Sequence, residues 1–117
     1  MPLVDSLQQG ISLFNRQLFF EAHEALEDAW RASAGDDRLF LQGLTQAAVA
    51  LHHHSVGNLV GAESVLARAI RNLAGYSGAR HGIQVKELRD MLSESLTIIQ
   101  SGHHLTTYPK MQVVNPT

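Results

Sequence analysis

The chain has 117 residues, of which 44% are hydrophobic and 17% charged. This length and composition predict one soluble globular domain rather than a disordered chain. Nine Lys and Arg against eleven Asp and Glu leave a net charge of −2, which argues against nucleic-acid binding through a basic face. The absence of cysteine excludes disulfides, thiolate metal sites and cysteine nucleophiles.

Membrane and secretory signals are also missing from the sequence. No apolar run approaches the roughly 20 residues needed to span a bilayer. The first residues, MPLVDSLQQG, lack the basic start and apolar stretch of a signal peptide. We therefore expect no membrane partner and a cytoplasmic location.

Helical periodicity dominates the chain, and sustained strand-like alternation is nearly absent. Apolar residues recur at three- and four-residue steps and predict helices over 4–15, 17–33, 37–56, 59–74 and 83–101. The end of the chain has two prolines and little periodicity. We therefore expect an all-α, single-domain five-helix bundle over residues 1–101, followed by an irregular C-terminal tail over 102–117.

Glycines and short polar residues mark two of the helix ends. Gly35 suits a left-handed closing position, and Asp36 or Asp37 suits the cap of the next helix. Gly57 suits a helix end, and Asn58 suits the following N-cap. The short break at Gly57 and Asn58 predicts that the third and fourth helices form a central antiparallel hairpin.

The predicted helix over 37–56 has the sequence of a central helix. It carries no formal charge between Leu39 and Leu51, which is typical of a helix buried on all sides. Gly61 and Ala62, near the start of the next helix, leave little side chain and predict a close crossing with a neighbour.

A polar stripe interrupts this otherwise apolar helix. At about 100° per residue, Gln42, Gln46, Val49 and His53 share one face. Buried polar groups without partners cost about 1–3 kcal/mol each. Another element must therefore face the stripe.

The preceding helix offers a matching side. At steps of three and four residues it carries Phe20, His23, Glu24, Glu27, Trp30 and Arg31. A purely solvated face would seldom hold two large aromatic residues. The sequence therefore predicts that His23, Glu27, Gln42, Gln46 and His53 meet in a semi-buried pocket between the two helices, walled by Phe20 and Trp30.

One interpretation of this pocket is a metal or small-ligand site. His23 and Glu27 at i and i+4 can reach one ion, and His53 would be a third ligand from the facing helix. Imidazole and carboxylate together suit zinc, iron or manganese. Glu24 would then be the candidate catalytic base and Gln46 an orienting group, with metal-assisted hydrolysis as the first chemistry to test.

Two other interpretations remain open at this stage. In the first, the pocket is a structural polar network in which Arg31 neutralises Glu27 and no chemistry takes place. In the second, the protein is a helical interaction module that uses an exposed groove of the first, fourth or fifth predicted helix to bind a protein partner or a second copy of itself. The sequence does not decide whether the protein is an enzyme.

The remaining histidines are expected to lie in solvent. Three consecutive helical residues point in directions about 100° apart, so His52 and His54 cannot share the face of His53 and should lie nearer solvent. His81 falls in a glycine-rich loop, and the pair at 103–104 falls in the tail.

Several of these segments together resemble the domain of unknown function 309 family. The similarity runs through Phe14 and Asn15, FFEAHEALEDAW at 19–30, LQGLTQAAVALHH at 41–53 and GNLVGAESVLARAIRNL at 57–73. The family pattern falls on Asn15, Phe20, Glu21, His23, Glu24, Glu27, Trp30, Gln46, His53, Gly57, Asn58, Gly61 and Ala62. The resemblance implies a small helical bundle of bacteria and archaea with no established activity. The chain departs from the family at His52, where an apolar or aromatic residue is usual, and at Ser55-Val56, near a usual basic residue.

Overall fold

The computed structural model describes residues 3–114. The helices are α1 (Leu3–Asn15), α2 (Phe19–Arg31), α3 (Asp36–Ser55), α4 (Leu59–Leu73) and α5 (Val85–Gln100), and the strands are β1 (Ala79–Arg80) and β2 (Ile83–Gln84). The predicted all-α fold with five helices is confirmed. The observed helix ends agree with the predicted ends to within about two residues, which is the ordinary uncertainty of a helix boundary.

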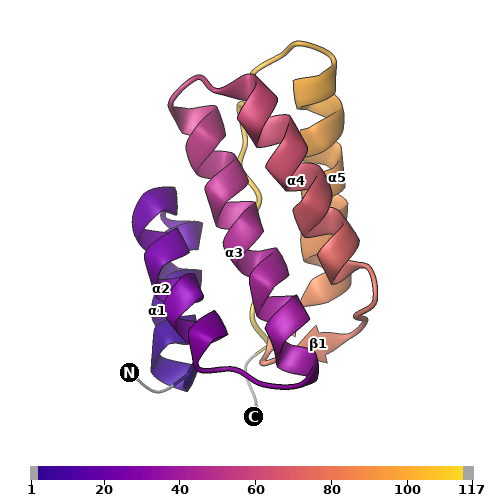
Figure 1. Cartoon of the computed structure of the whole chain (residues 1–117). Coiled ribbons are helices and arrows are strands. Elements are labelled where there is room, and N and C mark those ends of the chain that lie inside the picture. Colours follow the sequence, from indigo (N-terminus) through magenta and orange to yellow (C-terminus); the bar gives the residue numbers. More distant parts are fainter. Residues whose placement is uncertain (1–2, 115–117) are drawn as a thin grey trace.

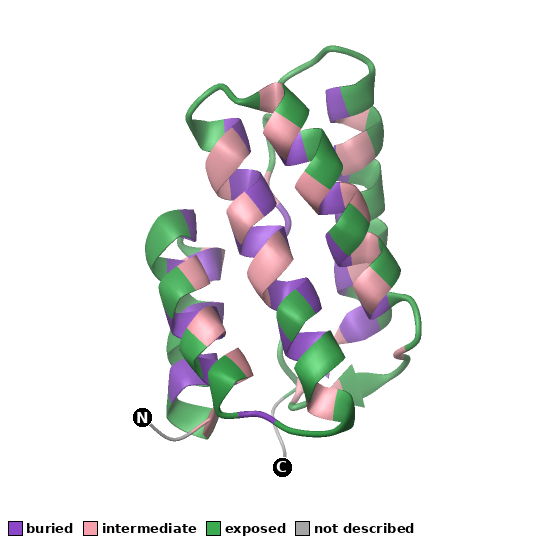
Figure 2. Ribbon diagram, viewed as in Figure 1, coloured by how far each residue is buried: buried purple, intermediate pink, exposed green. Residues whose placement is uncertain are grey.

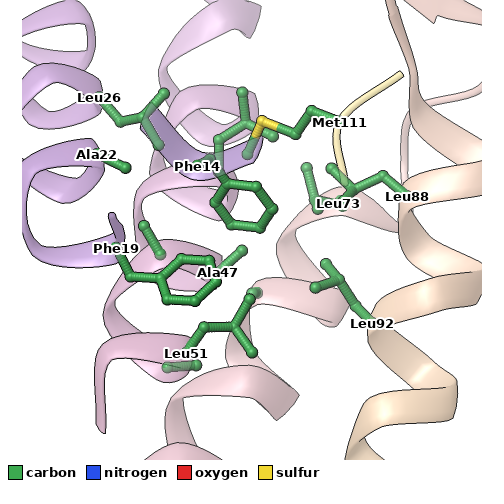
Figure 3. Close-up of a cluster of buried hydrophobic side chains, with 14 of the residues drawn as sticks. Phe14, Phe19, Ala22, Leu26, Ala47, Leu51, Leu73, Leu88, Leu92 and Met111 are labelled. Atoms are coloured by element: carbon green, nitrogen blue, oxygen red, sulfur yellow. The ribbon is translucent and has the colours of Figure 1, made fainter. Parts of the chain in front are cut away.

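α3 lies at the centre of the molecule. Figure 1 shows α1 and α2 on one side of α3, α4 and α5 on the other, and the C-terminal segment running behind α3. The core joins both sides of α3: Figure 3 shows Phe14, Phe19 and Leu26 on one side, Leu73 and Leu88 on the other, and side chains of α3 between them. The predicted antiparallel hairpin of α3 and α4 is the central pair of this bundle.

The charge-free helix is less enclosed than its composition predicts. Two faces of α3 are fully buried, but a narrow outer stripe between α2 and α4 stays half-buried or exposed (Figure 2). Gln42 is exposed on this stripe, whereas Gln46, Val49 and His53 are half-buried. The polar stripe therefore faces outward between two neighbouring helices rather than inward against one.

Local signals give one helix end correctly and another incorrectly. Gly57 has φ +83° and ends α3, and the Asn58 side chain accepts a hydrogen bond from the Gly61 N–H at 3.0 Å, as an N-cap should. At the start of α3, Gly35 itself is the N-cap, and no side-chain cap bond is present there. The predicted cap by Asp36 or Asp37 is therefore wrong: both lie in the first turn of α3, and the Asp37 carboxylate contacts a distant segment instead.

Two glycines allow helices to approach closely. A Cβ on Gly10 would lie 2.6 Å from Leu26 of α2, and one on Gly43 would lie 2.9 Å from Leu73 of α4. The three atoms nearest to a Cβ on Gly61 would all belong to the Asn58 cap, the closest at 2.5 Å. Gly61 thus leaves room for the cap, whereas the adjacent Ala62 is fully buried in the core.

A short hairpin and the tail close one end of the bundle. β1 and β2 pair antiparallel, with Arg80 opposite Ile83, and Ile83 also bridges to Val113 of the tail. His81, in the turn, is exposed as predicted, and its Nε2 also lies 3.1 Å from Asp37 Oδ1. Asp37 is thus held by the hairpin, which explains why it does not cap α3.

The predicted division into a bundle and a tail includes residues 1–2 and 115–117, which lie outside the described part of the chain. Within that part, the tail packs against the bundle and buries Leu105, Pro109 and Met111. Over residues 3–114, no helix is both long and apolar enough to cross a bilayer.

Candidate functional site

Most of the predicted pocket residues lie where α2 and α3 meet on the surface, a line that we call the α2–α3 seam. It is lined from α2 by Phe20, His23, Glu27 and Trp30, and from α3 by Gln42, Thr45, Gln46, Val49 and His52. The short 32–35 connection makes the two helices antiparallel and fixes which residues lie level with each other. Trp30 lies level with Gln42, and Phe20 lies level with His52.

Two small hollows follow one another along the seam. The first has a volume of about 120 Å³ and is lined by Phe20, His23, Val49 and His52. The second has a volume of about 180 Å³ and is lined by Glu27, Trp30, Gln42, Thr45 and Gln46. Both walls are mainly apolar, because the polar side chains contribute their stems as well as their heads.

A polar network occupies the α2 edge of the seam. Glu27 accepts a hydrogen bond from Arg31, and its other carboxylate oxygen lies 3.0 Å from His23 Nε2. Arg31 also reaches Asp28 at 3.4 Å. The His23 and Glu27 side chains are 27% and 32% exposed, so solvent screens the network. These bonds join residues of one helix and do not tie α2 to α3.

Two aromatic residues of the seam are partly exposed. Phe20 is 48% exposed and lies between two imidazoles, with ring centroids 5.9 Å from His23 and 5.4 Å from His52. The half-buried Trp30 carries the Arg38 guanidinium 4.3 Å from its ring centroid. Exposed aromatic area of this kind is concentrated in protein interfaces.

The flank of α2 beside the seam is acidic. A third hollow, of about 240 Å³, is lined by His23, Glu24, Glu27, Asp28 and Arg31. Glu21, Glu24 and Asp28 are exposed there. The candidate base Glu24 therefore lies on this outer flank and not in either seam hollow.

His53 does not join the predicted pocket. Its Nδ1 lies 3.3 Å from the Asn58 amide nitrogen, at the start of α4. Antiparallel pairing places Glu27 level with Gln46, and seven residues of helix separate Gln46 from His53 by about 10 Å. His52, one residue before it, lines the first hollow with His23, so His53 lies at the level of the seam, and its direction toward α4 keeps it out of the pocket.

The predicted three-residue metal set is consequently not assembled. The structure brings His23 and Glu27 together and leaves His53 on the α4 side. Within residues 3–114, no three His, Asp or Glu side chains lie close enough together to hold a metal ion. Gln46 also points partly toward α4, where its Oε1 accepts a hydrogen bond from Asn72 at 2.6 Å.

His52 and His54 both differ from the prediction. His52 is half-buried against Phe20 on the seam. His54 is 5% exposed, and its Nε2 accepts the Leu105 N–H at 3.1 Å. Burial lowers the pKa of His54, and the neighbouring His104 lowers it further. A sequence signal existed, because His54 continues the buried stripe of α3 through Ala47 and Leu51.

A second group of polar bonds, which we call the tail clamp, holds the C-terminal segment on the opposite side of the bundle core. It consists of the His54 bond to Leu105, a 3.4 Å contact between His54 Nδ1 and the Tyr108 hydroxyl, and Asn15. The Asn15 side chain donates to the Met111 carbonyl at 2.9 Å and accepts from the Met111 N–H at 2.8 Å. The Asn15 side chain therefore pairs with both backbone groups of Met111, as a residue of a neighbouring strand would.

The protein is a small helical bundle. Of the residues that carry the family resemblance, some line the open seam and others, such as Asn15, form the tail clamp. Residues 7–65, just over half of the chain, match the family model described as Domain of unknown function (DUF309). The chain belongs to this family, and the predicted resemblance is confirmed.

One relative is described as an uncharacterized protein of Aquifex aeolicus (strain VF5). It is 30% identical over 98 residues, which cover 83% of this chain and 29% of the relative. The chain thus spans less than a third of that relative's length.

Proposed function

We propose that this protein is an interaction module that binds an amphipathic helix of a partner protein along the α2–α3 seam. The observation that carries the proposal is the pair of small, mainly apolar hollows in line along the seam, of about 120 and 180 Å³. Pockets that enclose small-molecule ligands usually measure about 300–1,000 Å³. Two hollows below that range suit single side chains of a docked helix better than a whole ligand.

The spacing of the hollows supports a helical partner. From Val49 to Gln42, or from His52 to Thr45, the second hollow lies about seven residues, or roughly 10 Å, along α3 from the first. Seven residues are also two turns of a docked helix. Side chains at i and i+7 of a partner would therefore enter the two hollows, as in other complexes of a helix in a groove.

Charge supports a basic partner. The flank beside the hollows exposes Glu21, Glu24 and Asp28, with Arg31 as the neighbouring cation on α2. Complementary charge guides association and fixes orientation. The partner helix should therefore carry Lys or Arg beside its apolar stripe.

Trp30 provides a direct experiment, since it is the only tryptophan and lines the second hollow. The full chain is titrated with a synthetic tryptophan-free helix that has leucines along one stripe and lysines beside it, and with the same helix carrying glutamates. We expect a saturable change in Trp30 fluorescence, with tighter binding of the lysine peptide. Val49→Glu should abolish the change, because it places a charge in the first hollow.

Charge reversal provides the matched control. Glu24→Lys should weaken binding of the lysine peptide, whereas Glu87→Lys, an equal change on the exposed surface of α5, should not. If the two peptides give the same fluorescence response, or if both reversals act equally, the seam does not recognise a basic helix.

A second, narrower candidate is a metal site on His23. Glu27 holds His23 Nε2 at 3.0 Å, and metal-bound histidines commonly donate their second ring nitrogen to a carboxylate in this way. His23 Nδ1 would then be a ligand, but no three His, Asp or Glu side chains of residues 3–114 cluster, so zinc would bind weakly, with water in the remaining positions. Zinc titration by calorimetry tests this: His23→Ala should remove binding, while a His103→Ala, His104→Ala variant should retain it.

The cytoplasmic location expected from the sequence belongs to the same proposal. Fractionation of cells that express the chain at native level would check it. Recovery in the membrane or secreted fraction would contradict it.

A further inference from the structure

A hollow larger than either of those on the seam lies away from it. It has a volume of about 410 Å³ and is lined by Val4, Leu7, Gln8, Ile11 and Ser12 of α1, by His81 of the hairpin turn and by Val113 of the tail. This volume falls within the usual range of small-molecule sites, unlike the hollows of the seam. We call it the α1–hairpin cavity.

His81 is the one titratable side chain that lines this cavity. Its Nε2 lies 3.1 Å from Asp37 Oδ1, so the carboxylate fixes that nitrogen as a donor. The same Asp37 oxygen lies 2.9 Å from Arg80 Nη2 and accepts a hydrogen bond from Arg80 Nε at 3.0 Å. The Arg80 charge balances Asp37, so a protonated His81 would leave the cluster with a net positive charge at the cavity wall.

The backbone and Phe40 hold the imidazole in this position. His81 has φ +50° and Gly82 has φ +81°, the left-handed conformations of a tight hairpin turn. Paired strands fix this turn, with Arg80 opposite Ile83. The imidazole stacks on Phe40 with ring centroids 6.3 Å apart. A non-glycine residue held in a strained turn beside a cavity is a recurring feature of binding sites.

From this geometry we infer that the α1–hairpin cavity binds a small monocarboxylic acid with an apolar body. The carboxylate accepts a hydrogen bond from Nδ1 of protonated His81, which is the nitrogen that Asp37 leaves for a ligand. The apolar body packs on Val4, Leu7, Ile11 and Val113. Gln8 and Ser12 of α1 supply further polar contacts to the head group.

Sodium octanoate is a suitable probe, with 1-octanol as its uncharged counterpart. In ¹H–¹⁵N NMR titrations of the full chain, octanoate should give saturable shifts at Leu7, Ile11, His81 and Val113. Octanol should bind about tenfold more weakly, since it lacks the charged hydrogen bond. Intermolecular NOEs between octanoate and the methyl groups of Val4 and Val113 locate the ligand in the unmodified protein, without recourse to a variant.

Substitution of the histidines separates recognition from general hydrophobic binding. His81→Gln should remove the preference for octanoate over octanol, whereas His103→Gln in the exposed tail should leave it intact. The inference is overturned if octanoate gives no saturable shifts, if the shifts map to the seam, or if octanoate and octanol bind equally. Trp30 fluorescence reports the seam separately, so the two proposals fail independently.

Discussion

The α2–α3 seam and the tail clamp use similar polar residues in opposite ways. In the clamp, Asn15 and His54 bond to backbone groups 96 and 51 residues away in the chain, in surroundings that are buried or partly buried. On the seam, His23 and Glu27 bond to each other within one turn of helix and remain about a third exposed. The clamp residues hold distant segments together, whereas the seam residues leave the surface open.

This difference indicates which motif residues are needed for folding and which are available for binding. When a buried backbone N–H or carbonyl loses its hydrogen-bond partner, nothing offsets the free-energy cost of keeping that group out of water. A half-exposed ion pair within one helix is replaced by water at little cost. Stability measurements can therefore separate the two regions even before a ligand is known.

The largest effect is expected at Asn15. Asn15→Ala leaves both the N–H and the carbonyl of Met111 without their partner, so the free energy of unfolding should fall by about 2–4 kcal/mol. Urea denaturation measures the loss. Asn72→Ala is the matched control, because its amide makes a single bond to Gln46, and it should cost about 1 kcal/mol. Equal losses would contradict the division into clamp and seam.

A pH-dependent effect is expected at His54. Burial and the charge of His104 lower the pKa of His54 in the folded state below its ordinary 6.5. The unfolded chain therefore binds more protons, so stability is complete above pH 6.5 and falls as the pH drops toward the folded pKa. Protonation would also remove the nitrogen lone pair that accepts the Leu105 N–H. Urea midpoints between pH 7.5 and 5 measure the decline.

His54→Gln should reduce this pH dependence, since an amide oxygen accepts a hydrogen bond without titrating. His103→Gln, in the exposed tail, should leave it unchanged. If His54→Gln keeps the full decline in stability below pH 6.5, another group is responsible for it.

The fold could be predicted from the sequence because each helix carries its own apolar period and its own end signals. The face of each residue follows from that period, which is why Glu27, Trp30, Gln42 and Gln46 were correctly expected to lie together. The level of a residue along a neighbouring helix depends instead on the connecting segment 32–35. No periodic pattern encodes that offset, so the sequence predicts Glu27 beside His53, whereas Glu27 lies level with Gln46, about two turns of α3 away.

The tail clamp could not be predicted for a different reason. Its bonds join segments with no shared period, and they use backbone atoms of the tail as partners. Such contacts depend on how the whole bundle closes. His54 is the exception, because the sequence places it on the buried stripe of α3. The general expectation that a histidine near a helix end is solvated led to the wrong prediction.

The smallest effect is expected at Glu27. Glu27→Gln weakens a half-exposed network within α2, so the free energy of unfolding should fall by less than about 1 kcal/mol. Urea denaturation followed by circular dichroism measures this without relying on the nearby Trp30. Asp90→Asn, which breaks the exposed Lys86–Asp90 pair on α5, is the matched control for a lost i,i+4 pair.

A loss of about 2–5 kcal/mol at Glu27 would instead be typical of breaking a buried charged pair. The seam would then be a structural network like the clamp, and its open hollows would be incidental. A small loss combined with weaker binding of the lysine peptide would have the opposite meaning. Because Glu27 lines both the second hollow and the acidic flank, it would then contribute to recognition rather than to folding.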